Sequence, residues 1–371
     1  MNQEQLALLA LHCIPGIGGF TIRQLISYCG SARQVFNRPP GKLRKVPGIR
    51  RTSIDLILKN EGFHEAEALL QRAEKENSKI ILYSDDDFPR RLKNVFDAPT
   101  ILFHQGNADF NSLKSLAIVG TRKASSYGLG FVDELIEGLA RHQPLIVSGL
   151  AYGIDIRAHR AALKNGLSTV GVLASGTNII YPAAHKNTAK EMVTSGGLVS
   201  EYGFDILPDP KRFPARNRII AGTTDATIVI EAAARGGALI TAHMANGYDR
   251  DVFALPGNVH NTHSLGCNHL IKTHKAHILT RAEDIEYIMQ WDNDTRPAKI
   301  QPDLSALDAE EKAVVKALSD TADAITIDEL SWRAELPINK LASVLLNLEF
   351  RGYVNPLPGK IYKLSGELAR F

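Results

Sequence analysis

The sequence has few cysteines and no long apolar segment. Its 371 residues include three cysteines, Cys13, Cys29 and Cys267, which are far apart and odd in number. They predict no disulfide framework and are typical of a protein from a reducing cytosol. No run of about 18 uninterrupted apolar residues occurs, and the N-terminus has no basic segment before an apolar core. The sequence therefore predicts neither a membrane span nor a signal peptide, and we expect a cytoplasmic protein.

Motifs that would define a cofactor or a catalytic centre are also missing. There is no G-x-x-x-x-G-K-[ST] loop, no G-x-G-x-x-G after the first long strand, no G-x-S-x-G elbow and no H-E-x-x-H pair. Phosphate-loop nucleotide binding and the usual form of NAD binding are therefore disfavoured. The histidine-rich segment 260–277 matches no standard zinc ligand spacing. Asp155 and His159 are four residues apart on a predicted helix, where capping by the aspartate is favoured over acid–base catalysis. We predict no metal and no cofactor.

Positive charge is concentrated near the N-terminus. The whole chain has 43 Lys and Arg against 40 Asp and Glu, but residues 1–60 contain nine basic residues opposed only by Glu4 and Asp55. Short apolar helices in this region are separated by two similar Pro-Gly turns, at 14–18 and 46–50. The pattern indicates a helix-hairpin-helix or SAM-like module, whose turns can offer N–H groups to a DNA phosphate. The alternative is a packing module with a solvated basic face.

The middle of the chain alternates short β-rich runs with helical stretches. Runs such as TIVIEA and STVGVLA suit strands buried on both faces, and strict alternation of strands with helices indicates a parallel sheet. The fold class we expect is α/β, with an extended Rossmann-like, doubly wound, mostly parallel sheet. The expected strands are 80–83, 100–104, 116–120, 145–148, 169–173, 197–200, 226–230, 251–254 and 276–279. The expected helices are 126–141, 154–165, 185–194, 238–246 and 265–272.

Four parts of the chain follow from these patterns. We predict an N-terminal helical module (1–75), a Rossmann-like domain (76–290), a polar linker (291–303) and a winged-helix-like domain (304–371). The last part shows three predicted helices and a hairpin, but it carries eight basic against ten acidic residues. Readers of the DNA major groove need more positive charge than that, so a winged-helix transcription factor is disfavoured.

Glycine-rich loops follow several of the predicted strands. They occur at 120–128, 148–153, 174–177 and 236–237. In an open α/β sheet the carboxyl-end loops bind ligands, and glycine lets the backbone approach a phosphate. Tight strand-to-helix turns need glycine as well. Four such loops with Ser, Thr and Arg interleaved nevertheless favour a phosphate or nucleotide-like ligand.

A basic segment lies at 211–222. Lys211, Arg212 and Arg216 surround Phe213 here, and Asn217 follows. Arginine can pair with a phosphate in a bidentate manner, phenylalanine can stack on a base, and asparagine can bond a base edge or a backbone group. We therefore expect this segment and the glycine loops to form one site, with its arginines at the surface. The alternative is a solvated basic helix start with a buried phenylalanine.

The order of these motifs resembles the DNA-processing protein A (DprA/Smf) family. Between residues 118 and 280 the chain carries, in this order, IVGTRKASSYG, SGLAYGIDIRAH, YPAAH, SEYG, FPARNRIIAG, EAAARGGALITA, VFALPGNV and SLGCNHLI. The resemblance implies a non-enzymatic protein that binds single-stranded DNA in natural transformation. It also implies displacement of single-strand-binding protein, loading of the RecA recombinase, and a homodimer formed through the central domain.

The resemblance also implies the residues of an anion pocket. These are Gly120, Thr121, Arg122, Ser148, Gly149, Gly153, Lys211, Arg212, Phe213, Arg216 and Asn217. One segment departs from the family pattern. The family usually has an acidic residue and an asparagine after a Tyr-Pro pair, whereas Tyr181 and Pro182 are followed here by Ala-Ala-His. A role for this loop is therefore not carried over.

A nucleotide-binding or nucleoside-monophosphate-hydrolysing enzyme is the alternative function. Phosphoribohydrolases with a similar fold carry a Pro-Gly-Gly-x-Gly-Thr-x-x-Glu loop. The nearest segment here, 234–241, ends in Thr241, and Met244 stands where that loop has its glutamate. This difference disfavours hydrolysis.

Overall fold

The structure, a computed structural model, describes residues 2–291, 307–320, 324–351, 353–357 and 360–364. The chain divides into two compact units, Met1–Trp291 and Asp292–Phe371. Within the described ranges, no helix is long and apolar enough to cross a membrane. The module boundary at 75/76 stays a prediction, and the predicted linker beyond Trp291 lies outside the described residues.

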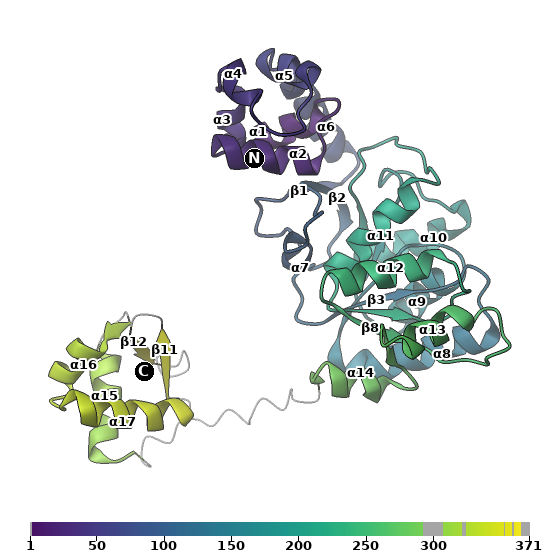
Figure 1. Cartoon of the computed structure of the whole chain (residues 1–371). Helices are drawn as coiled ribbons and strands as arrows, with labels where there is room; N and C mark the ends of the chain where they lie inside the picture. Colours follow the sequence, from purple (N-terminus) through teal and green to yellow (C-terminus); the bar gives the residue numbers. More distant parts are fainter. Residues whose placement is uncertain (1, 292–306, 321–323, 352, 358–359, 365–371) are drawn as a thin grey trace. The chain divides into compact units, whose positions relative to one another are not determined.

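Six helices form the N-terminal module of the first unit (Figure 1). They are α1 (Gln3–Cys13), α2 (Gly19–Cys29), α3 (Ala32–Phe36), α4 (Pro40–Leu43), α5 (Arg51–Leu58) and α6 (Gly62–Lys75). Asn2 begins α1 with a capping box that includes Gln5. The two Pro-Gly turns separate α1 from α2 and α4 from α5, with φ of +79° at Gly16 and +76° at Gly48. The predicted short helices separated by Pro-Gly turns are confirmed.

A nine-stranded sheet follows, in the order β1-β2-β6-β5-β4-β3-β7-β8-β9. Its strands are β1 (Lys79–Leu82), β2 (Ile101–Gly106), β3 (Ser115–Val119), β4 (Leu145–Ser148), β5 (Thr169–Val172), β6 (Gly196–Ser200), β7 (Ala226–Val229), β8 (Asp251–Ala254) and β9 (His277–Ile278). The seven strands β6, β5, β4, β3, β7, β8 and β9 pair in parallel with their neighbours. In contrast, β2 pairs antiparallel with both β1 and β6. The predicted mostly parallel sheet is confirmed.

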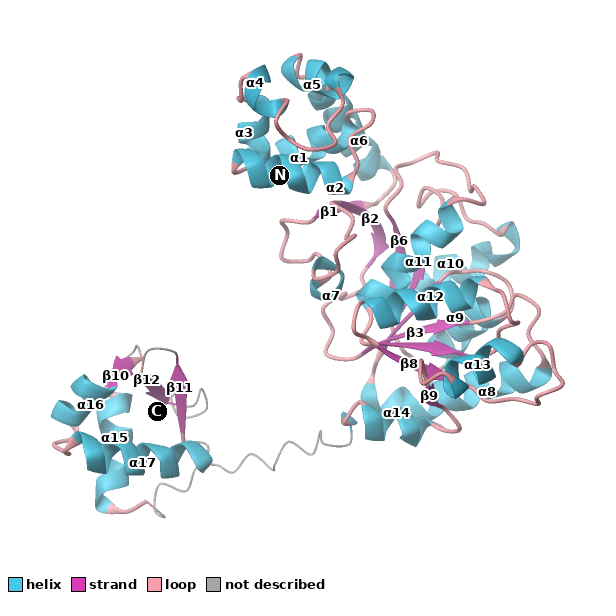
Figure 2. Cartoon of the chain, viewed as in Figure 1, coloured by secondary structure: helices cyan, strands magenta, loops and turns pink. Residues whose placement is uncertain are grey.

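Helices cover both faces of the sheet, as Figure 2 shows. On one face Leu116 and Ile118 pack with α8 (Ser126–Leu139), α9 (Ile154–Lys164) and α14 (Ala282–Ile288). On the other face Ala117 and Val119 pack with α11 (Arg212–Thr223), α12 (Gly237–Gly247) and α13 (Leu265–Lys272). This alternation along β3 is the period-two pattern of a strand buried on both sides. The helix α10 (Lys186–Thr194) packs beside β6.

The connections reverse direction at the centre of the sheet. From β3 the chain proceeds outward through β4 and β5, and after β6 it returns through α11 to β7 on the other side of β3. The loops after β3 and β7 therefore lead to helices on opposite faces. A crevice forms at such a switch point, at the carboxyl ends of the strands.

Several elements differ from the sequence predictions, and the helices α7 (Arg90–Lys93) and α14 were not predicted. The helix α11 was not among the expected helices, because Pro214 and a dense run of arginines obscure its helical pattern. Pro214 lies in the first turn of α11, where its missing N–H removes no helical hydrogen bond. The last strand, β9, covers only His277–Ile278 rather than 276–279.

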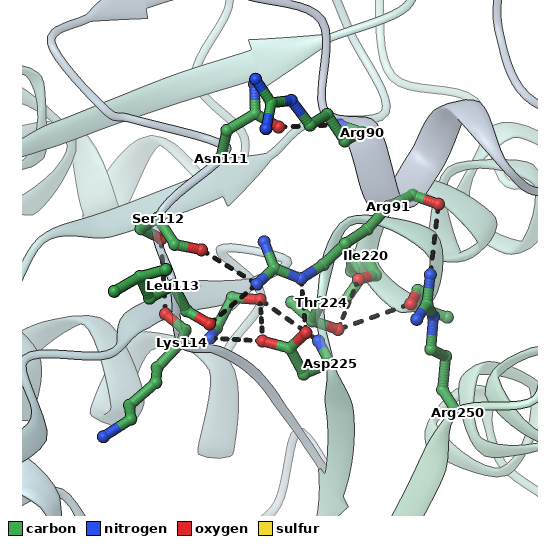
Figure 3. A network of polar contacts seen from close by, with 12 residues as sticks. Arg90, Arg91, Asn111, Ser112, Leu113, Lys114, Ile220, Thr224, Asp225 and Arg250 are labelled. Atoms are coloured by element: carbon green, nitrogen blue, oxygen red, sulfur yellow. Dashed lines mark hydrogen bonds and ion pairs between the residues drawn. The ribbon is translucent and has the colours of Figure 1, made fainter. Parts of the chain in front are cut away.

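A polar network joins the amino ends of β3 and β7 (Figure 3). Asp225 forms an ion pair with Arg91 of α7 (Arg90–Lys93) and accepts the N–H of Ser115 at 2.8 Å. The Arg91 guanidinium also donates to the carbonyl oxygens of Ser112 and Leu113 at 2.9 and 3.0 Å. The network therefore fixes the two central strands at the end opposite to their carboxyl-end loops.

The second unit contains a three-stranded sheet and three helices. The helices are α15 (Ala309–Ser319), α16 (Ile327–Arg333) and α17 (Ile338–Phe350), and the strands are β10 (Ile325–Thr326), β11 (Val354–Leu357) and β12 (Ile361–Leu364). The sheet order is β10-β12-β11, with both pairs antiparallel. Three helices with a β-hairpin are the predicted winged-helix arrangement. The short β10 was not predicted.

Candidate nucleic-acid site

A pocket of about 740 Å³ opens at the carboxyl ends of β3 and β7. Its walls come from residues 119–123 after β3, residues 231–241 after β7, and the first turns of α11. Ala151 from the loop after β4, Asp155 from the first turn of α9, and Tyr181 also line the pocket. The pocket thus lies at the switch point of the sheet, where this class of fold binds its ligands.

The N-terminus of α12 opens into the pocket. Gly236, its N-cap, and Gly237, its first residue, are exposed and line the pocket, and no side chain caps this end of the helix. The first N–H groups of a helix have no partner within the helix. Together with the helix dipole they attract an anion such as a phosphate.

Cationic and aromatic side chains meet at the rim. The guanidinium carbon of Arg122 lies 5.5 Å from the ring centroid of Phe213, a cation–π contact. The Phe213 ring lies 6.0 Å from that of Tyr181, which is 50% exposed. Lys123 and Arg235 are exposed residues of the same lining. The rim therefore presents positive charge beside aromatic rings that a base can stack against.

Arg216 lies beneath the rim instead of at the surface. It is 4% exposed, and its guanidinium donates to the carbonyl oxygens of Gly149, at 2.7 Å, and Val172. Both carbonyl groups lie at the carboxyl ends of strands, β4 and β5. The expectation of a surface arginine was wrong, because the helix that carries it packs directly on these strand ends. Arg216 joins α11 to the sheet.

Asp155 is the buried acidic neighbour of Arg216. Its carboxylate accepts the N–H of Ala151 at 3.3 Å. Burial raises the pKa of Asp155, and the nearby Arg216 charge opposes that rise. Burial likewise lowers the pKa of Arg216, and Asp155 opposes that change. The two charges make each other's burial less costly.

A second buried carboxylate holds the loops after β3 and β7 together. Glu231 is 2% exposed and accepts hydrogen bonds from the N–H and the hydroxyl of Ser125, at 2.8 and 2.6 Å. Its backbone carbonyl accepts the N–H of Thr121 at 2.7 Å. The loop that carries Arg122 is therefore held at both ends.

The predicted site residues divide into lining and supporting groups. The pocket is lined by Gly120, Thr121, Arg122, Phe213, Arg216 and Asn217, but not by Ser148, Gly149, Gly153, Lys211 or Arg212. Asn217 is 9% exposed, and its amide donates to the carbonyl of Gly237 at 3.3 Å. It bonds the backbone, which was one of its two predicted roles.

The remaining predicted residues support the pocket from outside. Ser148 is buried and donates to the carbonyl of Ile118, joining β3 and β4. Gly153 has φ of +76°, and a Cβ there would lie 2.2 Å from the carbonyl oxygen of Thr121. Arg212 lies over the ring of Tyr202, with its guanidinium carbon 5.3 Å from the centroid.

Close packing also explains why two other predicted positions, Gly149 and Gly120, are glycine. A Cβ on Gly149 would lie 2.4 Å from Nη1 of Arg216, and one on Gly120 would lie 2.5 Å from Ile154. Lys211 is exposed just before α11, and its N–H donates to Asp209 at 2.8 Å. Of these three residues, Gly120 lines the pocket, whereas Gly149 and Lys211 do not.

Three rim residues were outside the predicted set. Lys123 directly follows the predicted Arg122, and Arg235 lies in the glycine-containing loop after β7. Tyr181 lies in the segment that departs from the family pattern. Their signal in the sequence was weak, because only the folded chain shows that Tyr181 lies next to Phe213.

Asp155 and His159 do not form an acid–base pair. His159 is buried, and its Nδ1 is hydrogen bonded to the Thr169 hydroxyl at 2.7 Å. Burial lowers the pKa of His159 to about 3. In the described residues, no cluster of three or more His, Cys, Asp or Glu side chains is arranged to hold a metal ion, and this includes the segment 260–277.

Comparisons with known proteins identify the family. The model for DNA recombination-mediator protein A matches residues 79–290, and the model for the DprA winged helix domain matches residues 297–360. Protein Smf of Escherichia coli K12 is 36% identical over 296 residues, which are 78% of this chain and 79% of that protein. DNA processing protein DprA of Streptococcus pneumoniae R6 is 42% identical over 213 residues, 57% of this chain and 75% of that protein.

Solved structures agree with this assignment. The X-ray structure of DprA from Streptococcus pneumoniae has a TM-score of 0.66 at 34% identity, covering 77% of this chain and 97% of that one. A structure of DNA processing protein A from Helicobacter pylori, described as showing its single-stranded DNA binding mode, has a TM-score of 0.53 at 26% identity. It covers 58% of this chain and 96% of that one. This chain belongs to the DNA recombination-mediator protein A (DprA/Smf) family.

Proposed function

We propose that this protein is a non-enzymatic single-stranded DNA-binding protein that mediates recombination. It binds incoming single strands in natural transformation, eases displacement of single-strand-binding protein and loads the RecA recombinase. It acts in the cytoplasm as a homodimer. Family membership and the binding mode described for the Helicobacter pylori relative support this proposal.

The composition of the pocket carries the proposal. Arg122, Lys123 and Arg235 place positive charge around the N-terminus of α12, beside the rings of Phe213 and Tyr181. Single-strand binders combine a positive groove for the backbone with aromatic side chains for the bases. That combination contacts every nucleotide in the same way, so we expect little sequence preference.

The two carboxylates of the pocket favour binding over catalysis. Glu231 accepts two hydrogen bonds from Ser125, and Asp155 accepts an N–H beside Arg216. Each carboxylate is therefore engaged in hydrogen bonds within the fold. In addition, Met244 stands where the hydrolase loop has its glutamate. Incubation with nucleoside monophosphates tests this point. Release of free base would contradict the non-enzymatic function.

Fluorescence anisotropy with oligo(dT) and a blunt duplex of the same length tests the main claim. We expect much tighter binding of the single strand. The log–log slope against salt should be about −0.7 for each phosphate neutralised on a single strand. Arg122→Glu should weaken single-strand binding by at least about tenfold, and more than Arg122→Ala. Equal affinity for the two DNA forms would contradict the proposal.

The recombination step requires a separate experiment. RecA filament assembly is followed on oligo(dT) coated with single-strand-binding protein, with and without this protein. Acceleration by the wild type, but not by Arg122→Glu, is the expected result. A wild-type protein that binds single strands but does not accelerate assembly would contradict the mediator role alone.

Sedimentation of the free protein tests the homodimer.

A further inference from the structure

A second positively charged surface lies on the N-terminal module. We define it by Lys42, Arg44, Lys45, Arg50 and Arg51 and call it the cationic edge. All five residues are exposed, and residues 42–51 contain no aspartate or glutamate. They occupy the end of α4, the turn 46–50 and the start of α5, at the end of the module away from β1 in Figure 1.

The cationic edge has no protein partner for its charges among the residues that the structure describes. Within the described part of the chain, none of its five side chains takes part in an ion pair or a side-chain hydrogen bond. Other cations of the module do have partners. Arg38 donates to the carbonyl of Cys29 at 2.8 Å, and Lys59 pairs with Glu61 at 3.8 Å. A cluster of unpaired like charges repels itself, and an external anion relieves this repulsion.

The fold brings the first Pro-Gly turn against this edge. The Ser53 hydroxyl of α5 donates to the carbonyl of Pro15 at 3.3 Å. A Cβ built on Gly16 would lie 3.9 Å from Nη1 of Arg50. The two turns, far apart in sequence, therefore approach each other at Arg50. Leu43 and Val46 are buried in the module core, so the polar side of this segment faces outward.

We propose that the cationic edge binds the sugar–phosphate backbone of duplex DNA, at a site separate from the pocket. Residues 42–51 contain no aromatic side chain, so the segment that carries the five cations offers charge without a platform of its own for unstacked bases. Single-strand sites normally need such a platform. A duplex keeps its bases stacked and presents phosphates from two strands at fixed spacing, which charge alone can bind.

This second site goes beyond the proposed function and does not depend on it. With both sites, one protein can hold a single strand in the pocket and an adjoining duplex on the cationic edge. The substrate that uses both is a junction between single- and double-stranded DNA. Such a junction should bind more tightly than either part alone, because the second contact becomes intramolecular.

The test compares two full-length variants with equal changes of charge. The first is Lys45→Glu/Arg50→Glu/Arg51→Glu. The matched control is Lys186→Glu/Lys190→Glu/Lys272→Glu, which reverses three exposed lysines of α10 and α13. Anisotropy is measured with a blunt duplex, oligo(dT) and a junction of the two, across a salt series. Circular dichroism melting curves establish that both variants fold. Lys45→Gln/Arg50→Gln/Arg51→Gln replaces the first variant if it does not.

We expect the edge variant to lose at least about tenfold in duplex and junction affinity. Its oligo(dT) affinity should stay within about twofold, and its duplex salt slope should become shallower by about two to three. The control variant should bind all three probes like the wild type. Three results would overturn the proposal: no duplex binding by the wild type, unchanged duplex binding by the edge variant, or equal losses for the edge and control variants. Failure of the proposed function would instead appear as weak oligo(dT) binding by the wild type.

Discussion

Replacement of Arg216 should lower the free energy of unfolding, whereas replacement of Arg122 should leave it nearly unchanged. The two arginines line the same pocket, but Arg216 is 4% exposed and Arg122 is exposed. Arg216→Met leaves Asp155 buried without its compensating charge and removes the donor to the carbonyl groups of Gly149 and Val172. Removal of one member of a buried charge pair lowers stability by about 3–5 kcal/mol, because the other charge stays buried. An exposed substitution costs about 0.5 kcal/mol or less.

Urea unfolding followed by tryptophan fluorescence measures this difference. The chain has two tryptophans: Trp291 is 5% exposed in the first unit, and Trp332 is 81% exposed in the second. A Trp332→Phe background therefore restricts the signal to the unit that contains both arginines. We expect the free energy of unfolding to fall by about 3 kcal/mol or more for Arg216→Met and to stay nearly constant for Arg122→Ala.

The double variant Arg216→Met/Asp155→Leu provides the internal control. If the cost arises from an uncompensated buried carboxylate, removal of that carboxylate should recover part of the lost stability. Single-strand affinity should fall by about tenfold, or about 1.4 kcal/mol, for Arg122→Ala with its unfolding curve unchanged. The reasoning is refuted if Arg216→Met keeps wild-type stability and loses DNA binding in the way that Arg122→Ala does.

Four further predictions concern His159, Gly153, Arg91 and the second unit. Burial lowers the pKa of His159 from 6.5 to about 3, so the unfolded chain binds a proton that the folded chain excludes. His159 thus reduces stability as pH falls below 6.5, by about 2 kcal/mol between pH 7.5 and pH 5, and His159→Gln should remove this part of the fall in urea unfolding. Gly153→Ala, at φ of +76°, should cost about 1–3 kcal/mol and displace the loop of Arg122, lowering both melting temperature and single-strand affinity. Arg91→Met should cost about 1–3 kcal/mol in calorimetry without changing DNA affinity, because the side chain is 16% exposed and bonds far from the pocket. Truncation after Trp291 should change single-strand affinity by less than about tenfold in anisotropy, since the second unit is net acidic; a larger loss in a folded remainder would contradict this.

The sheet could be predicted from the sequence because its signal is local. Apolar runs such as the one at 226–230 identify strands buried on both faces, and the alternation with helices specifies their parallel direction. The glycines before Ile154 likewise indicate a tight turn. For the same reason the first half of the site, at Gly120 and Arg122, could be located from the loop after one strand.

The burial of Arg216 could not be predicted in the same way. Its environment is made by Gly149 and Val172, which come from two different strands and meet only after the chain reverses direction. A sequence pattern shows the spacing of arginines along α11, but not which of them faces a strand end. Tyr181 joins the rim by a similar convergence over a long stretch of chain.

The two edges of the sheet also determine how copies of this protein can associate. The outer strand at one edge, β1, packs against the helical module through Ile80 and Leu82. The opposite edge ends in β9, a strand of two residues. Continuation of the sheet from one molecule into the next could use only a very short hydrogen-bonded ladder at this edge, which disfavours edge-to-edge polymerisation. A stable pairing of two copies near this edge would instead have to bury side chains that are exposed in the single chain, such as the half-exposed Ile278.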